Sequence, residues 1–249
     1  MLELKNICFS YDNGFALEDI SFSLSKNNII GLVGPNGSGK TSLFRVIDNF
    51  VKTGSGQILI DGKDISFKSR KEIAKQIAFV PQLSQPPEGV SVFEMVSFGR
   101  YPYLDIFQNE TVKDIEIVKN AMDEVGISGF SGRDVSTLSG GEYQRVIIAR
   151  ALAQEAKILL LDEPVSHLDI KYQIEIMDLL KNIKKDKLII ATLHDLRLAA
   201  YYSDEILLLS KGRLFAKGYP SNILSPDNIS NVFGLKQEKV LQMGNILIK

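Results

Sequence analysis

The spacing of hydrophobic positions changes along the chain, and each spacing predicts a different element. Residues 2–9 form a β-like run, and residues 20–24 alternate apolar and polar side chains, which is typical of a half-buried strand. Residues 28–33 are a compact apolar run that predicts a strand. Residues 157–161 are too apolar for a half-exposed strand, which predicts a central strand of a parallel sheet. Residues 111–125 carry apolar side chains at helical spacing, which predicts an amphipathic helix.

Strands and helices alternate on both sides of a central stretch that lacks strong strands. We predict helices over 41–50, 140–154, 170–184 and 195–202, and strands over 57–60, 77–80, 188–193 and 205–209. A final hairpin begins at 211–212, and short helical turns follow Pro220 and Pro226. This order predicts a layered α/β domain with right-handed crossovers. Its core, residues 1–82 and 156–249, is interrupted by a helical subdomain at residues 83–155.

Composition narrows the class of protein. The 249 residues carry a formal net charge of -1, and a basic stripe that would indicate nucleic-acid binding is absent from the sequence. Cys8 is the single cysteine, so we expect no disulfide framework and a reducing environment. No secretory signal is visible, and no apolar run approaches the ~20 residues of a spanning helix. We therefore expect a soluble protein that reaches a membrane only through a partner.

Eight consecutive residues match the phosphate-binding pattern G-x-x-x-x-G-K-[ST], between a predicted strand and a predicted helix. In such a loop, glycines let backbone N–H groups point at a phosphate, and the helix N-terminus adds partial positive charge. The lysine reaches the β- and γ-phosphates, and the threonine hydroxyl holds Mg²⁺. A glycine-rich turn that only caps a helix is the alternative. We predict that ATP binds here, at Gly34, Pro35, Asn36, Gly37, Ser38, Gly39, Lys40, Thr41 and the following Ser42.

Two adjacent carboxylates follow the apolar strand that ends at residue 161. At the end of a central strand, Asp162 would face the Mg²⁺ beside Thr41. Glu163 would then point toward the γ-phosphate and polarise the attacking water as a general base. The alternative is a pair of solvated surface carboxylates. Beside a complete phosphate loop, the pair predicts an enzyme that hydrolyses ATP.

Residues 138–142, Leu-Ser-Gly-Gly-Glu, lead into a predicted helix. With the phosphate loop and the carboxylate pair, this motif resembles the signature of the ATP-binding cassette (ABC) family, and the resemblance covers the whole chain. Ser139, Gly140 and Gly141 form a second anion nest at a helix N-terminus. The resemblance implies a P-loop NTPase fold of the ABC ATPase type, with an N-terminal antiparallel β subdomain. It also implies a head-to-tail homodimer in which each signature closes over the γ-phosphate held by the other copy.

The resemblance assigns roles to four more residues. Gln82 aligns with a family glutamine that senses Mg²⁺ and the attacking water, and His194 with a histidine that contacts the γ-phosphate. Asp169 matches the loop that crosses the dimer interface, and Tyr11 matches the aromatic residue that stacks on adenine. The catalytic set implied is Glu163, His194, Gln82 and Lys40. Gln82 could instead be a surface polar residue, His194 a structural residue, and Tyr11 a tyrosine of the core or of a hairpin.

The resemblance also indicates which kind of ABC protein this is. Residues 90–103 lie where the family docks a separate membrane permease, although they could simply pack their own subdomain. The short segments at 99–103 (GRYPY), 191–196 (ATLHDL) and 231–234 (NVFG) are similar to segments of the ATP-binding subunits that import iron siderophores, haem and cobalamin.

We therefore expect a peripheral motor at the cytoplasmic face of the cell membrane, working with a permease and, indirectly, with a substrate-binding protein. A zinc or manganese importer, an exporter ATPase and a soluble ABC ATPase without a permease are the alternatives.

Overall fold

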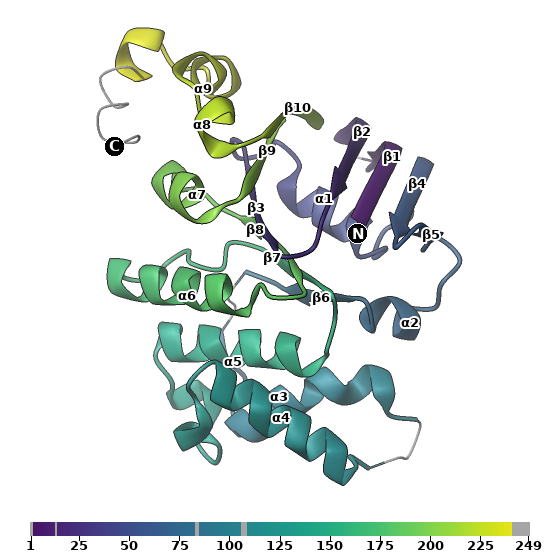
Figure 1. Cartoon of the computed structure of the whole chain (residues 1–249), viewed down its shortest axis with the longest axis vertical. Helices are drawn as coiled ribbons and strands as arrows, with labels where there is room; N and C mark the ends of the chain where they lie inside the picture. Colours follow the sequence, from purple (N-terminus) through teal and green to yellow (C-terminus); the bar gives the residue numbers. More distant parts are fainter. Residues whose placement is uncertain (1, 13, 83–84, 106–108, 241–249) are drawn as a thin grey trace. The chain divides into compact units, whose positions relative to one another are not determined.

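The computed structural model describes residues 2–12, 14–82, 85–105 and 109–240 (Figure 1). The chain falls into two compact units. Unit 1 comprises Met1–Phe67 and Leu188–Lys249, and unit 2 comprises Lys68–Lys187. Unit 1 is therefore built from both ends of the chain, and unit 2 is a continuous segment. The predicted division into a core and a helical subdomain at 83–155 stays a prediction.

Unit 1 contains a four-stranded antiparallel sheet in the order β2-β1-β4-β5. Side chains alternate between buried and exposed along β1 and β2, so that one face of these strands is apolar and buried. The pairing of β1 with β2 shifts its register at Ile7 and at Phe9. The strands are β1 (Leu2–Ser10), β2 (Ala16–Leu24), β4 (Ser55–Ile60) and β5 (Lys63–Asp64).

The second sheet of unit 1 has the buried strand β3 (Asn28–Val33) between two parallel neighbours, β8 (Leu188–Thr192) and β9 (Glu205–Ser210). Because their carboxyl ends meet at one edge, the residues that follow β3 and β8 lie close together. The antiparallel strand β10 (Arg213–Gly218) pairs with β9. The helices of unit 1 are α1 (Lys40–Ile47), α7 (Leu196–Tyr202), α8 (Pro220–Ile223) and α9 (Pro226–Phe233).

Unit 2 carries one parallel pair, β6 (Ile77–Val80) and β7 (Ile158–Leu161). Every element described between these two strands is a helix, and α3, α4 and α5 pack on one another (Figure 1). The helices of unit 2 are α2 (Arg70–Ala74), α3 (Val92–Ser97), the 3-10 helix η1 (Phe98–Tyr103), α4 (Val112–Glu124), η2 (Ser128–Phe130), η3 (Val135–Thr137), α5 (Gly140–Ala153) and α6 (Ile170–Ile183).

In the described part of unit 2, four helices begin with a capping box. A serine or threonine hydroxyl accepts a backbone N–H three residues later, and the acidic side chain there accepts the backbone N–H of the capping residue. The pairs are Ser69 with Glu72, Ser91 with Glu94, Thr111 with Asp114, and Ser139 with Glu142. The capping boxes therefore fix where α2, α3, α4 and α5 start.

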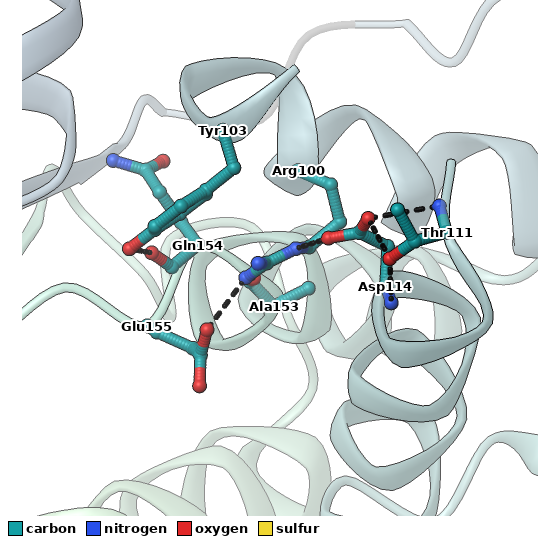
Figure 2. A network of polar contacts seen from close by, with 7 residues as sticks. All are labelled: Arg100, Tyr103, Thr111, Asp114, Ala153, Gln154 and Glu155. Carbon is teal, nitrogen blue, oxygen red and sulfur yellow. Dashed lines mark hydrogen bonds and ion pairs between the residues drawn. The ribbon is translucent and has the colours of Figure 1, made fainter. Parts of the chain in front are cut away.

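Arg100 lies at the centre of a polar cluster between η1, α4 and the end of α5 (Figure 2). Arg100 is 3% exposed, and its guanidinium donates to Asp114 at 2.9 Å, to the Ala153 carbonyl at 2.7 Å and to Glu155 at 2.8 Å. Hydrogen bonds from Thr111 and then from Arg100 hold the pKa of Asp114 below its ordinary value, against the opposing effect of burial. The carboxylate therefore stays ionised and paired with the buried cation.

Tyr103 extends this cluster to the start of β6. Its ring lies under the Arg100 guanidinium, 4.0 Å from carbon to centroid, and its hydroxyl donates to the Gln154 carbonyl at 3.1 Å. The Gln154 amide in turn donates to the Ile77 carbonyl at 2.8 Å. Residues 99–103, which resemble a segment of the importer branch, therefore contribute the Arg100 and Tyr103 side chains that join η1 to α4, α5 and β6.

The expected fold class is confirmed: the chain is mixed α/β, with an antiparallel N-terminal sheet and strands that are mostly parallel elsewhere. The predicted helix over 41–50 is too long, because α1 ends at Ile47 and Asn49 adopts a left-handed backbone conformation with φ 51°. The sequence reading also missed α2 and α3. No helix among the described residues has the length and apolar character needed to cross a bilayer.

Replacing Arg100 by methionine should destabilise the protein by about 3–5 kcal/mol, because the buried Asp114 carboxylate would lose its cation. Urea unfolding measures this change. Lys71→Met is the matched control, since it removes a cation that pairs with the exposed Asp105 near the same segment and should cost under about 1 kcal/mol. Equal losses for the two variants would contradict the role given to Arg100.

Candidate functional site

The phosphate loop connects β3 to α1 in unit 1, as predicted. The Lys40 ammonium is buried and donates to the carbonyls of Gly34 at 2.8 Å and Pro35 at 3.1 Å. The backbone N–H of Ser38 donates to Pro35, which closes a tight turn inside the loop. The loop is therefore curled around its own lysine, and a phosphate bound there would offer Lys40 charged oxygens in place of neutral carbonyls.

Two glycines of the loop are required by their surroundings. A Cβ atom at Gly34 would lie 2.3 Å from the Leu209 carbonyl oxygen, so the loop packs directly against the end of β9. Gly39 has a left-handed φ of 106°, and a Cβ there would lie 2.7 Å from Leu17 and 2.9 Å from Phe15. These contacts fix the loop against β9 and against the hairpin between β1 and β2.

Tyr11 lies in that same hairpin. Its ring packs edge-on against Phe9, with centroids 4.6 Å apart, and its hydroxyl accepts a hydrogen bond from Arg45 of α1 at 3.4 Å. Its backbone N–H donates to the Phe15 carbonyl at 2.9 Å. Because Phe15 also packs against Gly39, the hairpin and the phosphate loop are close neighbours within unit 1. This position is compatible with base stacking by Tyr11.

His194 follows β8 at the same sheet edge as the phosphate loop. The register pairs Leu32 with Thr192, so the chain leaves both strands at the same level, and the Leu193 N–H donates to the Leu32 carbonyl at 3.2 Å. The His194 side chain is exposed. The topology of unit 1 therefore places His194 at the sheet edge from which the phosphate loop also leaves.

Gln82 and Glu163 come together in unit 2. The register pairs Val80 with Leu161, and each site residue stands two positions further on. The Gln82 amide donates to the Glu163 carboxylate at 3.0 Å. Glu163 has a left-handed backbone with φ 51°, a conformation that costs a non-glycine residue energy and is common at functional sites. The sequence reading did not foresee this contact.

Asp162 immediately precedes Glu163 in the sequence and is buried, with 7% exposure. Its backbone N–H donates to the Val80 carbonyl at 2.8 Å, which continues the β6–β7 ladder by one step. The described residues contain no cluster of three or more histidine, cysteine or acidic ligands. A carboxylate is a ligand type that Mg²⁺ prefers, so the side chain of Asp162 fits the magnesium role predicted for it.

The signature residues begin α5. Ser139 caps the helix: its hydroxyl accepts from the Glu142 N–H, and its own N–H donates to the Glu142 carboxylate at 2.8 Å. This backbone hydrogen bond is the main cause of the lowered pKa of Glu142. Gly140 and Gly141 follow at the first two helical positions, where backbone N–H groups have no intrahelical acceptor. The arrangement can accept an anion from outside the chain.

Asp169 is exposed and caps α6 without a side-chain hydrogen bond to the helix. It follows a loop in which the Ser166 hydroxyl donates to the Glu163 carbonyl at 2.9 Å. The predicted interface residue is therefore joined to the predicted base by a short, hydrogen-bonded turn.

The predicted site residues fall into both units. Unit 1 holds the phosphate loop with Ser42, Tyr11 and His194, and unit 2 holds Gln82, Asp162, Glu163, the signature and Asp169. Their functional roles stay predictions.

Comparisons with known proteins agree on one family. A family model described as "ABC transporter" matches residues 17–166. The petrobactin import ATP-binding protein FpuD of Bacillus anthracis is 38% identical over 94% of this chain and 87% of its own length. The iron(3+)-hydroxamate import ATP-binding protein FhuC of Bacillus subtilis (strain 168) is 36% identical over 96% and 90%. A solved ABC transporter described as metal-chelate type, in an inward-facing conformation, matches with TM-score 0.83 and 29% identity over 94% of this chain and 88% of that one.

Glu163→Gln should leave ATP binding intact and lower the hydrolysis rate by a factor of about 10²–10⁴, because the amide cannot take a proton from the attacking water. Phosphate release measures the rate, and a fluorescent nucleotide measures binding. Glu116→Gln is the control, since it neutralises an exposed carboxylate on α4 and should leave both unchanged. Hydrolysis at the normal rate in Glu163→Gln would refute the assignment of the base.

Proposed function

Because this chain belongs to the ABC transporter family, whose ATP-binding subunits hydrolyse ATP to drive transport, we propose that it powers a binding-protein-dependent importer of an iron chelate. The observation that carries the cargo class is the likeness, over more than nine tenths of the chain, to the petrobactin and hydroxamate import subunits. Haem and cobalamin are the other cargoes of the importer branch that the short segments at 99–103, 191–196 and 231–234 resemble, and these segments do not separate the three.

The catalytic proposal assigns each step to a side chain of this protein. Lys40 and the loop N–H groups hold the β- and γ-phosphates, and Glu163 takes the proton from the attacking water. Gln82 orients the Glu163 carboxylate through the hydrogen bond between them. His194 stabilises the γ-phosphate by donating a hydrogen bond to it. Mg²⁺, held by Thr41, Asp162 and Gln82, would neutralise phosphate charge.

Two copies of the chain are proposed to assemble head to tail around ATP. The support is chemical: Gly140 and Gly141, next to Ser139, present backbone N–H donors that the capping box of α5 leaves available for a further anion. The phosphate loop of the same chain already provides a complete cradle for one triphosphate. A second copy therefore gives the signature a ligand, and ATP binding stabilises the pair by mass action.

The permease is proposed to dock on the helical part of unit 2, at residues 90–103, and to hold the protein at the cytoplasmic face of the cell membrane. Tyr101 is 58% exposed and packs on Phe98 with ring centroids 5.1 Å apart. Beside these rings, Arg100 and Tyr103 join η1 firmly to α5. An exposed aromatic residue on a rigid base is suited to receive a helix of a partner. A substrate-binding protein would act through that permease.

Purified Glu163→Gln protein should dimerise when Mg-ATP is added and stay largely monomeric without nucleotide. ATP would bridge the phosphate loop of one copy and the signature of the other, while blocked hydrolysis keeps the dimer closed. Analytical ultracentrifugation at several protein concentrations measures the change. A chain that remains monomeric at saturating Mg-ATP would exclude the two-copy site.

Reconstitution with a candidate permease in liposomes tests the cargo. ATP hydrolysis should rise when a binding protein loaded with a ferric siderophore is added, because docking of the loaded protein favours the closed ATP-bound pair. The same binding protein without cargo, and a zinc-loaded binding protein with its own permease, are the controls. Stimulation only in the zinc system, or by no binding protein at all, would contradict the proposed importer.

A further inference from the structure

The two glycines of the signature are not required by their own backbone conformation. Gly140 and Gly141 lie within α5, and neither has a positive φ. A Cβ atom at Gly141, however, would lie 2.6 Å from Cδ1 and 2.9 Å from Cγ of Tyr172, a distance that real Cβ atoms essentially never show. The reason for glycine at position 141 therefore lies within the chain, in the ring of Tyr172.

Tyr172 belongs to the first turn of α6, three positions after Asp169. Its neighbour in the preceding loop, Leu168, makes a similar contact, since a Cβ at Gly140 would lie 3.3 Å from its Cδ2. One turn further along both helices, Arg145 of α5 pairs with Glu175 of α6 at 2.9 Å. The first two turns of α5 are thus joined to the start of α6 and the loop before it at three successive points.

We infer that Tyr172 is a positioning residue: by packing on Gly141, its ring fixes the position of the signature nest relative to the loop that carries Asp169. The inference rests on the proposed function, in which both the signature and Asp169 face the second copy. With the ring in place, the start of α5 and the start of α6 present their polar groups as one surface. Without it, the nest loses the packing that fixes its N–H groups.

A competing explanation is that position 141 must be glycine because the partner copy's nucleotide needs the space. If the partner's γ-phosphate needed the space at position 141, removing the Tyr172 ring could not make an alanine acceptable there. If the ring is the obstacle, Tyr172→Ala should make room for an alanine at position 141, because this change removes both close atoms, Cγ and Cδ1. The two explanations therefore differ in whether the double variant recovers.

The test measures the dissociation constant of the Mg-ATP dimer by sedimentation, in the Glu163→Gln background. Gly141→Ala should weaken the dimer roughly tenfold or more, because overpacking moves the helix start. Gly141→Ala combined with Tyr172→Ala should be tighter than Gly141→Ala alone. Tyr172→Ala alone should weaken the dimer several-fold, because the signature nest loses the ring that packs against it. Tyr172→Phe, which keeps the ring, should match the parent.

Gly129→Ala is the matched control, since Gly129 lies in unit 2, has no positive φ and has no atom within 4 Å of a Cβ; it should match the parent. Nucleotide binding by each variant without dimerisation reports that the chain is folded. If Gly141→Ala does not fold, the comparison of Tyr172→Ala with Tyr172→Phe decides the matter, and equal affinities overturn the inference.

A double variant as weak as Gly141→Ala also overturns it. Failure of the Glu163→Gln parent to dimerise at all removes the premise and overturns the proposed two-copy function together with this inference. Normal dimerisation of the parent combined with an unchanged Tyr172→Ala overturns the inference alone.

Discussion

The interaction on which the rest of this structure depends is the proposed binding of a triphosphate by oriented backbone N–H groups. One lysine cannot balance the charge of ATP, so a loop must supply further donors, and these donors need a backbone held in an unusual curl. Contacts with Leu209, Leu17 and Phe15 hold Gly34 and Gly39 in that curl. The buried parallel strands of unit 1 provide the edge from which the loop and His194 both emerge.

The position of Glu163, the proposed general base, depends on a second pair of parallel strands, β6 and β7. Equal register along β6 and β7 brings Gln82 and Glu163 within hydrogen-bonding distance, although 81 residues separate them in the sequence. The start of β6 is joined through Gln154 to Tyr103 and Arg100, and hence to η1. Within unit 2, a continuous set of polar contacts therefore runs from the proposed docking segment to β6, the strand that precedes Gln82.

Much of the fold and of the candidate site could be predicted from the sequence, for physical reasons that differ by element. The strand at 28–33 was predicted with its correct bounds because a strand buried on both faces has a continuous apolar pattern. The short helices α2 and α3 were missed because so few residues show no helical period, although the capping boxes at Ser69 and Ser91 mark their starts. The packing of Tyr172 on Gly141 and the Arg100 cluster join residues far apart in sequence, so no local pattern could reveal them.

The central claim is that one triphosphate is held by the loop of one copy and by the signature of another. A structure of the Glu163→Gln protein with Mg-ATP, assembled with its permease, tests this most directly. The account predicts that Ser139 of one copy lies within hydrogen-bonding distance of the γ-phosphate bound at Lys40 of the other. A closed, ATP-loaded assembly in which Ser139 faces no phosphate would contradict it.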